Sequence, residues 1–238
     1  MTALVGDNGA GKSTMVKCVR GIYAIDAGTV TFDGNQVAIH SPRDASALGI
    51  EVVYQDLALC DNLDIVQNMF LGREKVRGLV LDEPTMEQMA GDTLASLSVR
   101  TVKSLRQLVA SLYGGQRQTV AIAKAVLWNS RVVILDEPTA ALGVAQTAQV
   151  LELVRRLADN GLGVVLISHN MNDVFAVSDR VAALYLGRTA AQVKTSDVTH
   201  SQIVELITSG RSGNLGLPQE SPSDFNGDIV DLTPGGAQ

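Results

Sequence analysis

Short apolar runs alternate with amphipathic stretches along most of this chain. The apolar runs have no regular polar interruptions, which is typical of strands that are buried on both faces of a parallel sheet. Strands are expected at residues 2–5, 50–54, 132–135, 164–168 and 180–185, and a hairpin at residues 29–39. Helices are expected at residues 14–20, 145–160, 171–177 and 200–208. This alternation predicts an α/β fold with a mainly parallel sheet.

The region between residues 57 and 128 has a different pattern. Runs of β-branched residues become rare there, and apolar residues recur at helical spacing. Helices are expected at residues 65–71, 85–97 and 116–127. We interpret the region as an α-helical subdomain that is inserted into an α/β core made of residues 1–56 and 129–210. Together these parts form one predicted domain over residues 1–210.

Composition and charge narrow the class of protein. The chain has 238 residues, of which 46% are hydrophobic and 18% charged, a balance typical of a globular protein. Its net charge of −6 gives no general reason to bind nucleic acid, so we expect no such partner. Cys18 and Cys60 are far apart and lack metal-ligand spacing, as in proteins of a reducing compartment.

No apolar run is long enough to cross a bilayer, and the first residues lack a signal-peptide pattern. We therefore expect a cytoplasmic protein, or one that lies peripherally on the inner face of the cell membrane. Residues 211–238 are rich in Gly, Ser, Pro and Asp, which predicts a flexible C-terminal tail.

The clearest chemical motif lies in residues 6–14, which read Gly-Asp-Asn-Gly-Ala-Gly-Lys-Ser-Thr. A glycine, four residues and then Gly-Lys-Ser is the pattern of a phosphate-binding loop, and it follows a predicted strand and precedes a predicted helix. The residues expected to bind a nucleotide here are Gly6, Asn8, Gly9, Ala10, Gly11, Lys12, Ser13 and Thr14. Lys12 supplies a cation for the phosphates, and Ser13 a hydroxyl for Mg²⁺.

Other polar side chains stand at the predicted ends of strands. Gln55, Asp136, Glu137 and His169 each follow an apolar run, and ligands of parallel sheets gather at the carboxyl ends of strands. Asp136 can hold Mg²⁺, and Glu137 can polarise an attacking water. Taken singly, an Asp-Glu pair fits an exposed turn and a histidine fits a structural role, but their joint placement favours a site that hydrolyses a nucleoside triphosphate.

These motifs together resemble the ATP-binding cassette ATPases from residue 1 to about Gly210. The resemblance implies a P-loop NTPase fold with a RecA-like parallel core. It identifies residues 112–116, Leu-Tyr-Gly-Gly-Gln, as the signature motif and residues 135–139 as the Walker B segment. The catalytic residues that it implies are Glu137, His169, Gln55 and Lys12, and the Mg²⁺ ligands are Ser13, Gln55 and Asp136.

The same family works as a head-to-tail dimer, in which each ATP lies between the phosphate loop of one subunit and the signature motif of the other. The signature residues implied to contact the partner's ATP are Leu112, Gly114, Gly115 and Gln116. Since this chain has one phosphate loop and no internal repeat, the resemblance implies a homodimer of two identical copies.

A finer resemblance links the chain to the cassettes of bacterial carbohydrate importers of the ribose and xylose type. It rests on residues 6–12, on Asn-Met-Phe-Leu-Gly at 68–72 and on Gly-Gln-Arg-Gln at 115–118. It implies integral membrane permease subunits as partners, indirect cooperation with an extracytoplasmic sugar-binding protein, and uptake of a monosaccharide.

The chain departs from the family pattern at two places inside the motifs. Tyr113 stands where the signature motif usually has Ser, and Gly143 where the segment after Walker B usually has Asp. A degenerate cassette that binds ATP with little turnover is therefore an alternative function. A soluble, non-transport cassette ATPase is another, although the paired cassettes or long coiled coils expected of one are not found in the sequence.

Two further expectations concern other parts of the chain. Residues 81–85 repeat residues 135–139 letter for letter, and we interpret them as the cap of the following helix rather than as a second catalytic segment. Only Met1 to Val5 precede the phosphate loop, whereas the family carries earlier strands with an aromatic residue that stacks on adenine. We therefore expect a fragment or a miscalled start, with weak discrimination between ATP and GTP and a tendency to aggregate.

Overall fold

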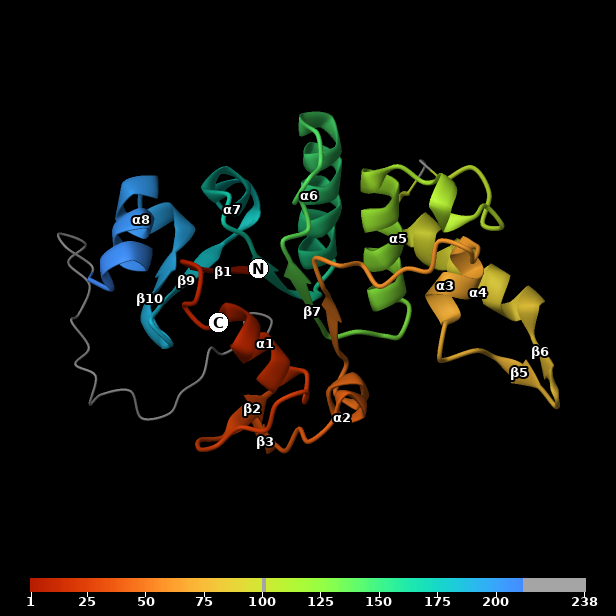
Figure 1. The fold of residues 1–238 in the computed structure, drawn as a ribbon, viewed down its shortest axis with the longest axis horizontal. Coiled ribbons are helices and arrows are strands. Elements are labelled where there is room, and N and C mark those ends of the chain that lie inside the picture. Colours follow the sequence, from red (N-terminus) through yellow and green to blue (C-terminus); the bar gives the residue numbers. More distant parts are fainter. Residues whose placement is uncertain (100–101, 212–238) are drawn as a thin grey trace.

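A computed structural model describes residues 1–99 and 102–211 of the chain (Figure 1). A six-stranded sheet forms its centre. The strands run across it in the order β10 (Arg188–Lys194), β9 (Arg180–Tyr185), β1 (Thr2–Gly6), β8 (Gly163–Ile167), β7 (Val132–Asp136) and β4 (Ile50–Val53). All neighbours are parallel except β9 and β10. The predicted α/β class is thus confirmed, whereas the predicted tail lies, from residue 212, outside the described residues.

Helices cover both faces of this sheet. On one side lie α1 (Lys12–Val19) and α2 (Pro42–Ala47), and on the other α6 (Val144–Asp159), α7 (Met171–Val177) and α8 (His200–Ser209). Successive side chains of β1 alternate between the two layers: Leu4 packs with Val16 of α1, while Ala3 and Val5 pack with Ile203 of α8. Burial on both faces explains why the strands read as unbroken apolar runs.

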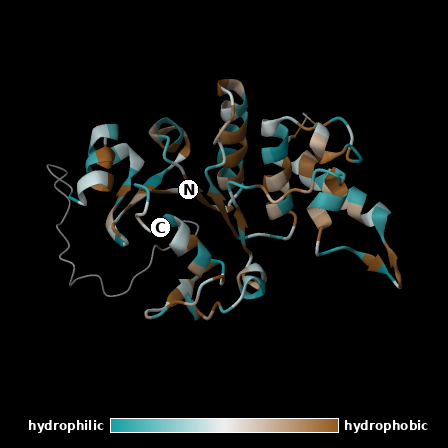
Figure 2. Cartoon of the chain, viewed as in Figure 1, coloured by the Kyte–Doolittle hydropathy of each residue, from teal (hydrophilic) through white to brown (hydrophobic). Residues whose placement is uncertain are grey.

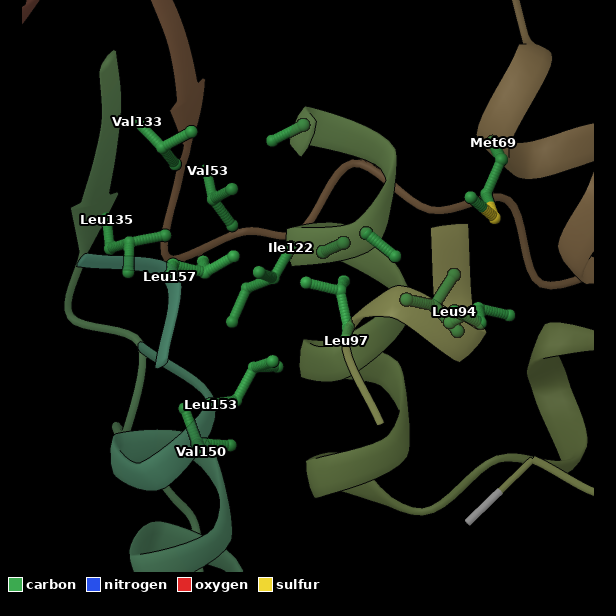
Figure 3. Packing of buried hydrophobic residues seen from close by; sticks show 14 of the residues in the cluster. Val53, Met69, Leu94, Leu97, Ile122, Val133, Leu135, Val150, Leu153 and Leu157 are labelled. Atoms are coloured by element: carbon green, nitrogen blue, oxygen red, sulfur yellow. The ribbon is translucent and has the colours of Figure 1, made fainter. Parts of the chain in front are cut away.

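Three helices form the region between β4 and β7. They are α3 (Ile65–Phe70), α4 (Glu83–Ser96) and α5 (Gly114–Val126), with a 3-10 turn, η1 (Val109–Ser111), before α5. Figure 3 shows how Met69, Leu94 and Ile122 of these helices continue into the residues of α6 and β7, so that one apolar cluster joins the helices to the sheet. Burial of such side chains contributes roughly 1.5–3 kcal/mol each.

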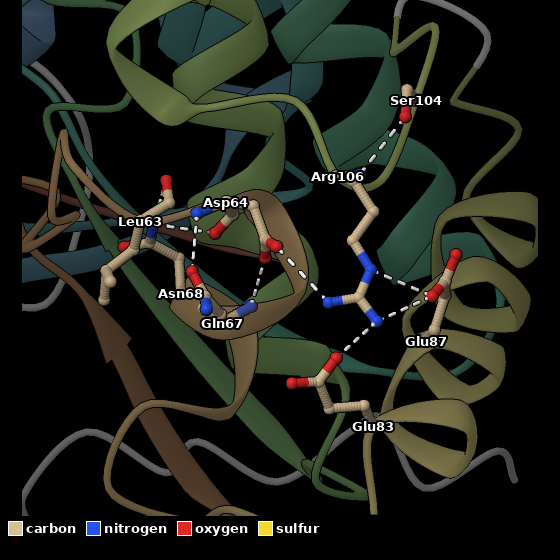
Figure 4. Close-up of polar contacts among 8 residues, drawn as sticks. All are labelled: Leu63, Asp64, Gln67, Asn68, Glu83, Glu87, Ser104 and Arg106. Atoms are coloured by element: carbon tan, nitrogen blue, oxygen red, sulfur yellow. Dashed lines mark hydrogen bonds and ion pairs between the residues drawn. The ribbon is translucent and has the colours of Figure 1, made fainter.

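A polar network also ties this helical region together (Figure 4). Arg106 contacts Asp64 at 3.4 Å, Glu83 at 3.1 Å and Glu87 at 2.8 Å. Asp64 accepts a hydrogen bond from the backbone N–H of Gln67 and caps α3. One guanidinium therefore links the starts of α3 and α4 to the loop that precedes η1.

The remaining elements include some that the sequence pattern did not predict. The predicted hairpin is present as β2 (Val30–Phe32) and β3 (Asn35–Val37). The strand β10 and a short hairpin made of β5 (Val76–Arg77) and β6 (Val80–Leu81) were not predicted. A 3-10 turn, η2 (Thr195–Asp197), follows β10. Helices α1 and α5 each begin two residues before the predicted start, so their glycine-rich entries lie within or next to the first turn.

Candidate functional site

The phosphate loop connects the end of β1 to the start of α1. Gly9 and Gly11 have φ angles of 82° and 101°, in the left-handed region that favours glycine. A Cβ atom on Gly6 would lie 2.7 Å from the carbonyl oxygen of Leu184, so only glycine allows the loop to pass this close to β9. The first backbone N–H groups of α1 have no intrahelical acceptor, as in any helix, and Gly11 offers no side chain to cap them. This cradle fits an anion such as phosphate.

Side chains of the loop complete this anion site. Lys12 Nζ donates to the carbonyl oxygens of Gly6 at 2.7 Å and Asp7 at 3.1 Å, so the lysine folds back over the loop. Ser13 and Thr14, in the first turn of α1, are exposed to solvent. A cation and exposed hydroxyls therefore stand at the mouth of the cradle.

The end of β7 brings two carboxylates to the same edge of the sheet. Burial and the negative charge of Glu137 raise the pKa of Asp136, while the positive charge of Lys12 opposes this shift. A divalent cation beside Asp136 would favour its charged form, and the residue thus suits a metal ligand. Among the described residues, no group of three or more His, Cys, Asp or Glu side chains could hold a metal alone. Phosphate oxygens and a hydroxyl would have to supply the other ligands.

Glu137 lies in an unusual backbone conformation. Its φ angle is 50°, in the left-handed region, and its N–H donates to the carbonyl oxygen of Ile167 on β8. Such a conformation costs a non-glycine residue about 1–3 kcal/mol and is frequent at functional sites. The turn aims the carboxylate toward the end of β8.

There, His169 meets the carboxylate of Glu137. His169 Nδ1 lies 2.8 Å from Glu137 Oε2, and the backbone N–H of His169 donates to Oε1 at 3.0 Å. The glutamate side chain is only 14% exposed, whereas the histidine side chain is 77% exposed. The structure thus brings together two residues that are 32 positions apart in the sequence, with the histidine facing solvent.

A third acid supports this pair and was not identified from the sequence. Asp173 on α7 is buried, accepts a hydrogen bond from Thr139 Oγ1 at 2.6 Å and accepts another from Asn170 Nδ2 at 3.1 Å. It therefore ties the segment after β7 to the segment after β8. The only signal for it was an acid in the first turn of a predicted helix, which is too common to single out.

Gln55 follows β4, the neighbour of β7, and is exposed at the same edge of the sheet. The hydroxyl of the preceding Tyr54 is buried without a hydrogen-bond partner in the part of the chain that the structure describes. Burial raises the pKa of Tyr54, and the positive charges of Arg20 and Lys17 oppose the shift. Gln55 and Asp136 thus stand at the carboxyl ends of neighbouring strands, and within the described residues no hydrogen bond joins them.

The signature segment lies apart from the phosphate loop. Leu112 is buried, Gly114 and Gly115 form the first turn of α5, and Tyr113 before them is 75% exposed. The backbone N–H of Tyr113 donates to Gln116 Oε1 at 3.0 Å. A Cβ atom on Gly115 would lie 3.2 Å from Cβ of Gln146, so glycine lets α5 approach α6 closely. The phosphate loop packs with a different apolar cluster from α5 and α6.

A cavity of about 250 Å³ lies beside Gln55, between β4 and the helices α3 and α5. Arg20 and Arg73 line it, and both pair with the buried carboxylate of Glu51, at 3.2 and 2.9 Å. Leu57 and Trp128 also line it.

No helix of residues 1–99 and 102–211 is long and apolar enough to cross a membrane.

Comparison with known proteins identifies a family and several relatives of this chain. The sequence model of the family described as ABC transporter matches residues 1–140. The fructose import ATP-binding protein of Rhizobium meliloti is 44% identical over 88% of this chain and 83% of its own length. The xylose/arabinose import ATP-binding protein of Sulfolobus acidocaldarius is 41% identical over 92% of this chain and 87% of its own. A ribose import ATP-binding protein of Streptomyces avermitilis is 39% identical, and the match covers 41% of its length.

Solved structures agree on the fold. The structure of cbiO1 from Clostridium perfringens, described as part of the ABC transporter complex cbiONQ, matches with a TM-score of 0.71 and 25% identity over 90% of this chain and 86% of its own. A nucleotide-free ATP-binding cassette from an ABC transporter matches with a TM-score of 0.75 and 20% identity, covering 91% and 87% of the two chains.

Proposed function

The chain belongs to the ABC transporter family, and from this premise we propose that it is the ATPase subunit of an importer that takes up a monosaccharide through a membrane permease. Its relatives are sugar import ATP-binding proteins. The observation that carries the ATPase assignment is the contact of Glu137 with His169 at 2.8 Å, on the sheet edge where the phosphate loop lies.

In the proposed reaction, the phosphates of ATP lie in the cradle of residues 6–14. Lys12 exchanges its two carbonyl acceptors for the β- and γ-phosphates, and the open N–H groups at the start of α1 bind phosphate oxygens. Glu137 orients the attacking water and accepts its proton, while His169 contacts the γ-phosphate. Ser13, Gln55 and Asp136 would hold Mg²⁺, which neutralises the charge of the phosphates when bound.

We propose that a second copy completes the site. Leu112, Gly114, Gly115 and Gln116 would contact the ATP held by the other copy, because the signature segment and the phosphate loop are apart within one chain. A head-to-tail homodimer gives two complete sites.

The permease would dock in the cavity beside Gln55, on the cytoplasmic face of the membrane, with a sugar-binding protein acting on the other side. This cavity lies between the proposed core of residues 1–56 and 129–210 and the proposed helical subdomain of residues 57–128. Its position next to Gln55 would let permease movements reach the catalytic edge.

The test is ATP hydrolysis by the chain with its co-encoded permease, with and without sugar. Wild type is expected to hydrolyse ATP, with stimulation by the permease, and Lys12→Ala is expected to lose tight ATP binding or turnover because the phosphates lose their cation. Lys103→Ala, a matched change of an exposed lysine, serves as control. Unchanged hydrolysis in Lys12→Ala would show that the site assignment is wrong.

One observation favours a second candidate, a cassette with little turnover. Tyr113 is 75% exposed at the start of α5, where the partner's ATP would approach. If the phenol obstructs the γ-phosphate, Tyr113→Ser raises turnover, because catalysis is sensitive to small misplacements. A fall in turnover would instead show that the tyrosine is adapted to the site.

A further inference from the structure

A half-buried lysine of α5, Lys124, lines the cavity beside Gln55. It is the only charged residue among residues 120–126, the second half of the helix, whose other members are apolar. Figure 2 shows the change from hydrophilic to apolar colouring along α5. Within the described residues, Lys124 forms no ion pair or hydrogen bond. A charge that is removed from water without such a contact is costly, and charges of this kind are frequent at binding sites.

The carboxylate of Glu51, which also lines this cavity, is already shared by two arginines. Its Oε1 lies 2.9 Å from Nη2 of Arg73, and its Oε2 lies 3.2 Å from Nη2 of Arg20. Burial lowers the pKa of Lys124, and the charges of Cys60 and Glu51 oppose this shift only in part. Lys124 is therefore a third cation beside a carboxylate whose two oxygens are both occupied.

The charges that line the cavity do not cancel. They are three cations and two acids: Arg20, Arg73, Lys124, Glu51 and Asp56. Asp56 is exposed, and its carboxylate accepts from the backbone N–H of Ala58 at 3.4 Å. The next charged residues along the chain after Arg73 are Glu74 and Lys75, whose charges cancel. The lining thus has an excess of one positive charge, which an anion would neutralise.

The rest of the cavity wall indicates what kind of anion fits. Leu57, Met69, Leu71 and Trp128 also line the cavity, and Leu71 is 43% exposed. A small inorganic anion would leave these apolar side chains in contact with water. A segment of another protein can cover them and bring a carboxylate at the same time, because the cores of protein interfaces combine apolar groups with a few paired polar ones.

We propose that Lys124 pairs with a carboxylate of the permease, on an Asp or Glu side chain that enters this cavity among apolar neighbours. The inference rests on the proposed function, since it names the chemistry of the permease contact. Entry of the segment would exclude water from the cavity, and the attraction between the two charges is stronger in such surroundings than in water.

The experiment measures the affinity of the full chain for its co-encoded permease in detergent, without nucleotide. Lys124→Gln should weaken binding about 30-fold or more, because truncation of one member of a buried charge pair leaves the other charge unpaired. Lys103→Gln changes an exposed lysine of the same helical region and serves as the matched control. Its affinity should stay within about twofold of wild type.

A thermal melt shows that a loss of affinity is not a loss of folding. The Tm of Lys124→Gln should be no lower than that of wild type, because the lowered pKa of Lys124 means that folding disfavours its charged form.

A second set of variants identifies the carboxylate. Each Asp and Glu of the cytoplasmic loops of the permease is changed in turn to Asn or Gln, and each variant is tested with wild type and with Lys124→Gln. One acid should be coupled to the lysine: its loss should weaken binding of wild type by a similar factor, yet change binding of Lys124→Gln by less than about twofold.

Two results would overturn the inference and leave the ATPase assignment in place. One is equal affinity of wild type and Lys124→Gln for the permease. The other is a loss of affinity in Lys124→Gln that is coupled to no acid of the permease, which would mean that the cavity receives no carboxylate from it. Failure of wild type to bind the permease at all would overturn the proposed function together with this inference.

Discussion

Residues 81–85 and 135–139 have the same letters, Leu-Asp-Glu-Pro-Thr, but different structures. The first copy begins with the last residue of the exposed β6, and Asp82 caps α4 by accepting from the N–H of Thr85. The second begins with the last two residues of the buried β7, and its Glu137 takes a left-handed conformation against β8. The prediction that residues 81–85 cap a helix is confirmed.

The two glutamates show what this difference means chemically. Glu83 is the first residue of α4, is half exposed and pairs with Arg106 in a network that holds helices together. Glu137 is nearly buried and contacts a histidine at the edge where the phosphate loop lies. A short sequence motif therefore acquires its chemistry from the strand that precedes it and from the neighbours of that strand.

The largest expected difference is in ATP turnover between variants of the two glutamates, Glu137 and Glu83. Glu137→Gln should lower ATP turnover by about 10²–10⁴-fold, the usual contribution of a general base, while ATP binding persists. Glu83→Gln should leave turnover near wild type. Steady-state hydrolysis checks this, and size exclusion should reveal an ATP-dependent dimer of Glu137→Gln. Equal losses in the two variants would mean that the wrong carboxylate was assigned.

The basic residues that pair with the two glutamates, His169 and Arg106, should differ in the same way in their effect on ATP turnover. His169→Ala should lower turnover about 100-fold, as loss of one transition-state contact does. Arg106→Ala should leave turnover within about twofold, because its ion pairs with Asp64, Glu83 and Glu87 involve none of the residues proposed to act on ATP. Turnover of both variants is measured at saturating ATP. A larger loss of turnover in Arg106→Ala than in His169→Ala would contradict this prediction.

The threonine of each segment, Thr139 or Thr85, donates a hydrogen bond to an aspartate, and its replacement tests what that bond contributes to stability. Thr139→Ala removes the donor to buried Asp173 and should lower the free energy of unfolding by about 1–3 kcal/mol. Thr85→Ala removes only an exposed bond to Asp82 and should cost under about 0.5 kcal/mol. Urea unfolding measures both, and Thr139→Ser, which keeps the hydroxyl, should restore most of the stability. Similar values for the two alanine variants would show that Asp173 is satisfied by other means.

The smallest expected effects are on the thermal stability of variants of the two aspartates, Asp82 and Asp136. Asp82→Ala should cost about 1 kcal/mol as a lost helix cap, a fall in Tm of about 2–4 °C. Asp136→Asn should keep or raise Tm at neutral pH, because the raised pKa of Asp136 means that folding disfavours its charged form. This gain should vanish as the pH falls below the ordinary aspartate pKa, where Asp136 is protonated in both states. A loss of stability in Asp136→Asn at neutral pH would contradict this.

Several elements could be predicted because their signals are local. The phosphate loop, the apolar strands and the cap formed by residues 81–85 each depend on neighbouring residues, and the structure has all of them where expected. The strand β10 escaped prediction because its connection to β9 uses Leu186 and Gly187, both with positive φ, and leucine is not a turn signal. The hairpin of residues 75–81 escaped because its strands have two residues each.

By itself, the sequence determined where a glycine-rich turn joins a strand to a helix and which runs must be buried, since glycine spacing and apolar periodicity act within a few residues. Tertiary structure alone decided that the carboxylate of Glu137 contacts His169 and that Asp173 ties together the segments that carry them. It also decided that residues 112–116 lie apart from the loop of residues 6–14. The physical reason is that strand order in a sheet is a long-range property: β7 and β8 become neighbours only when the apolar faces of helices on both sides are buried together.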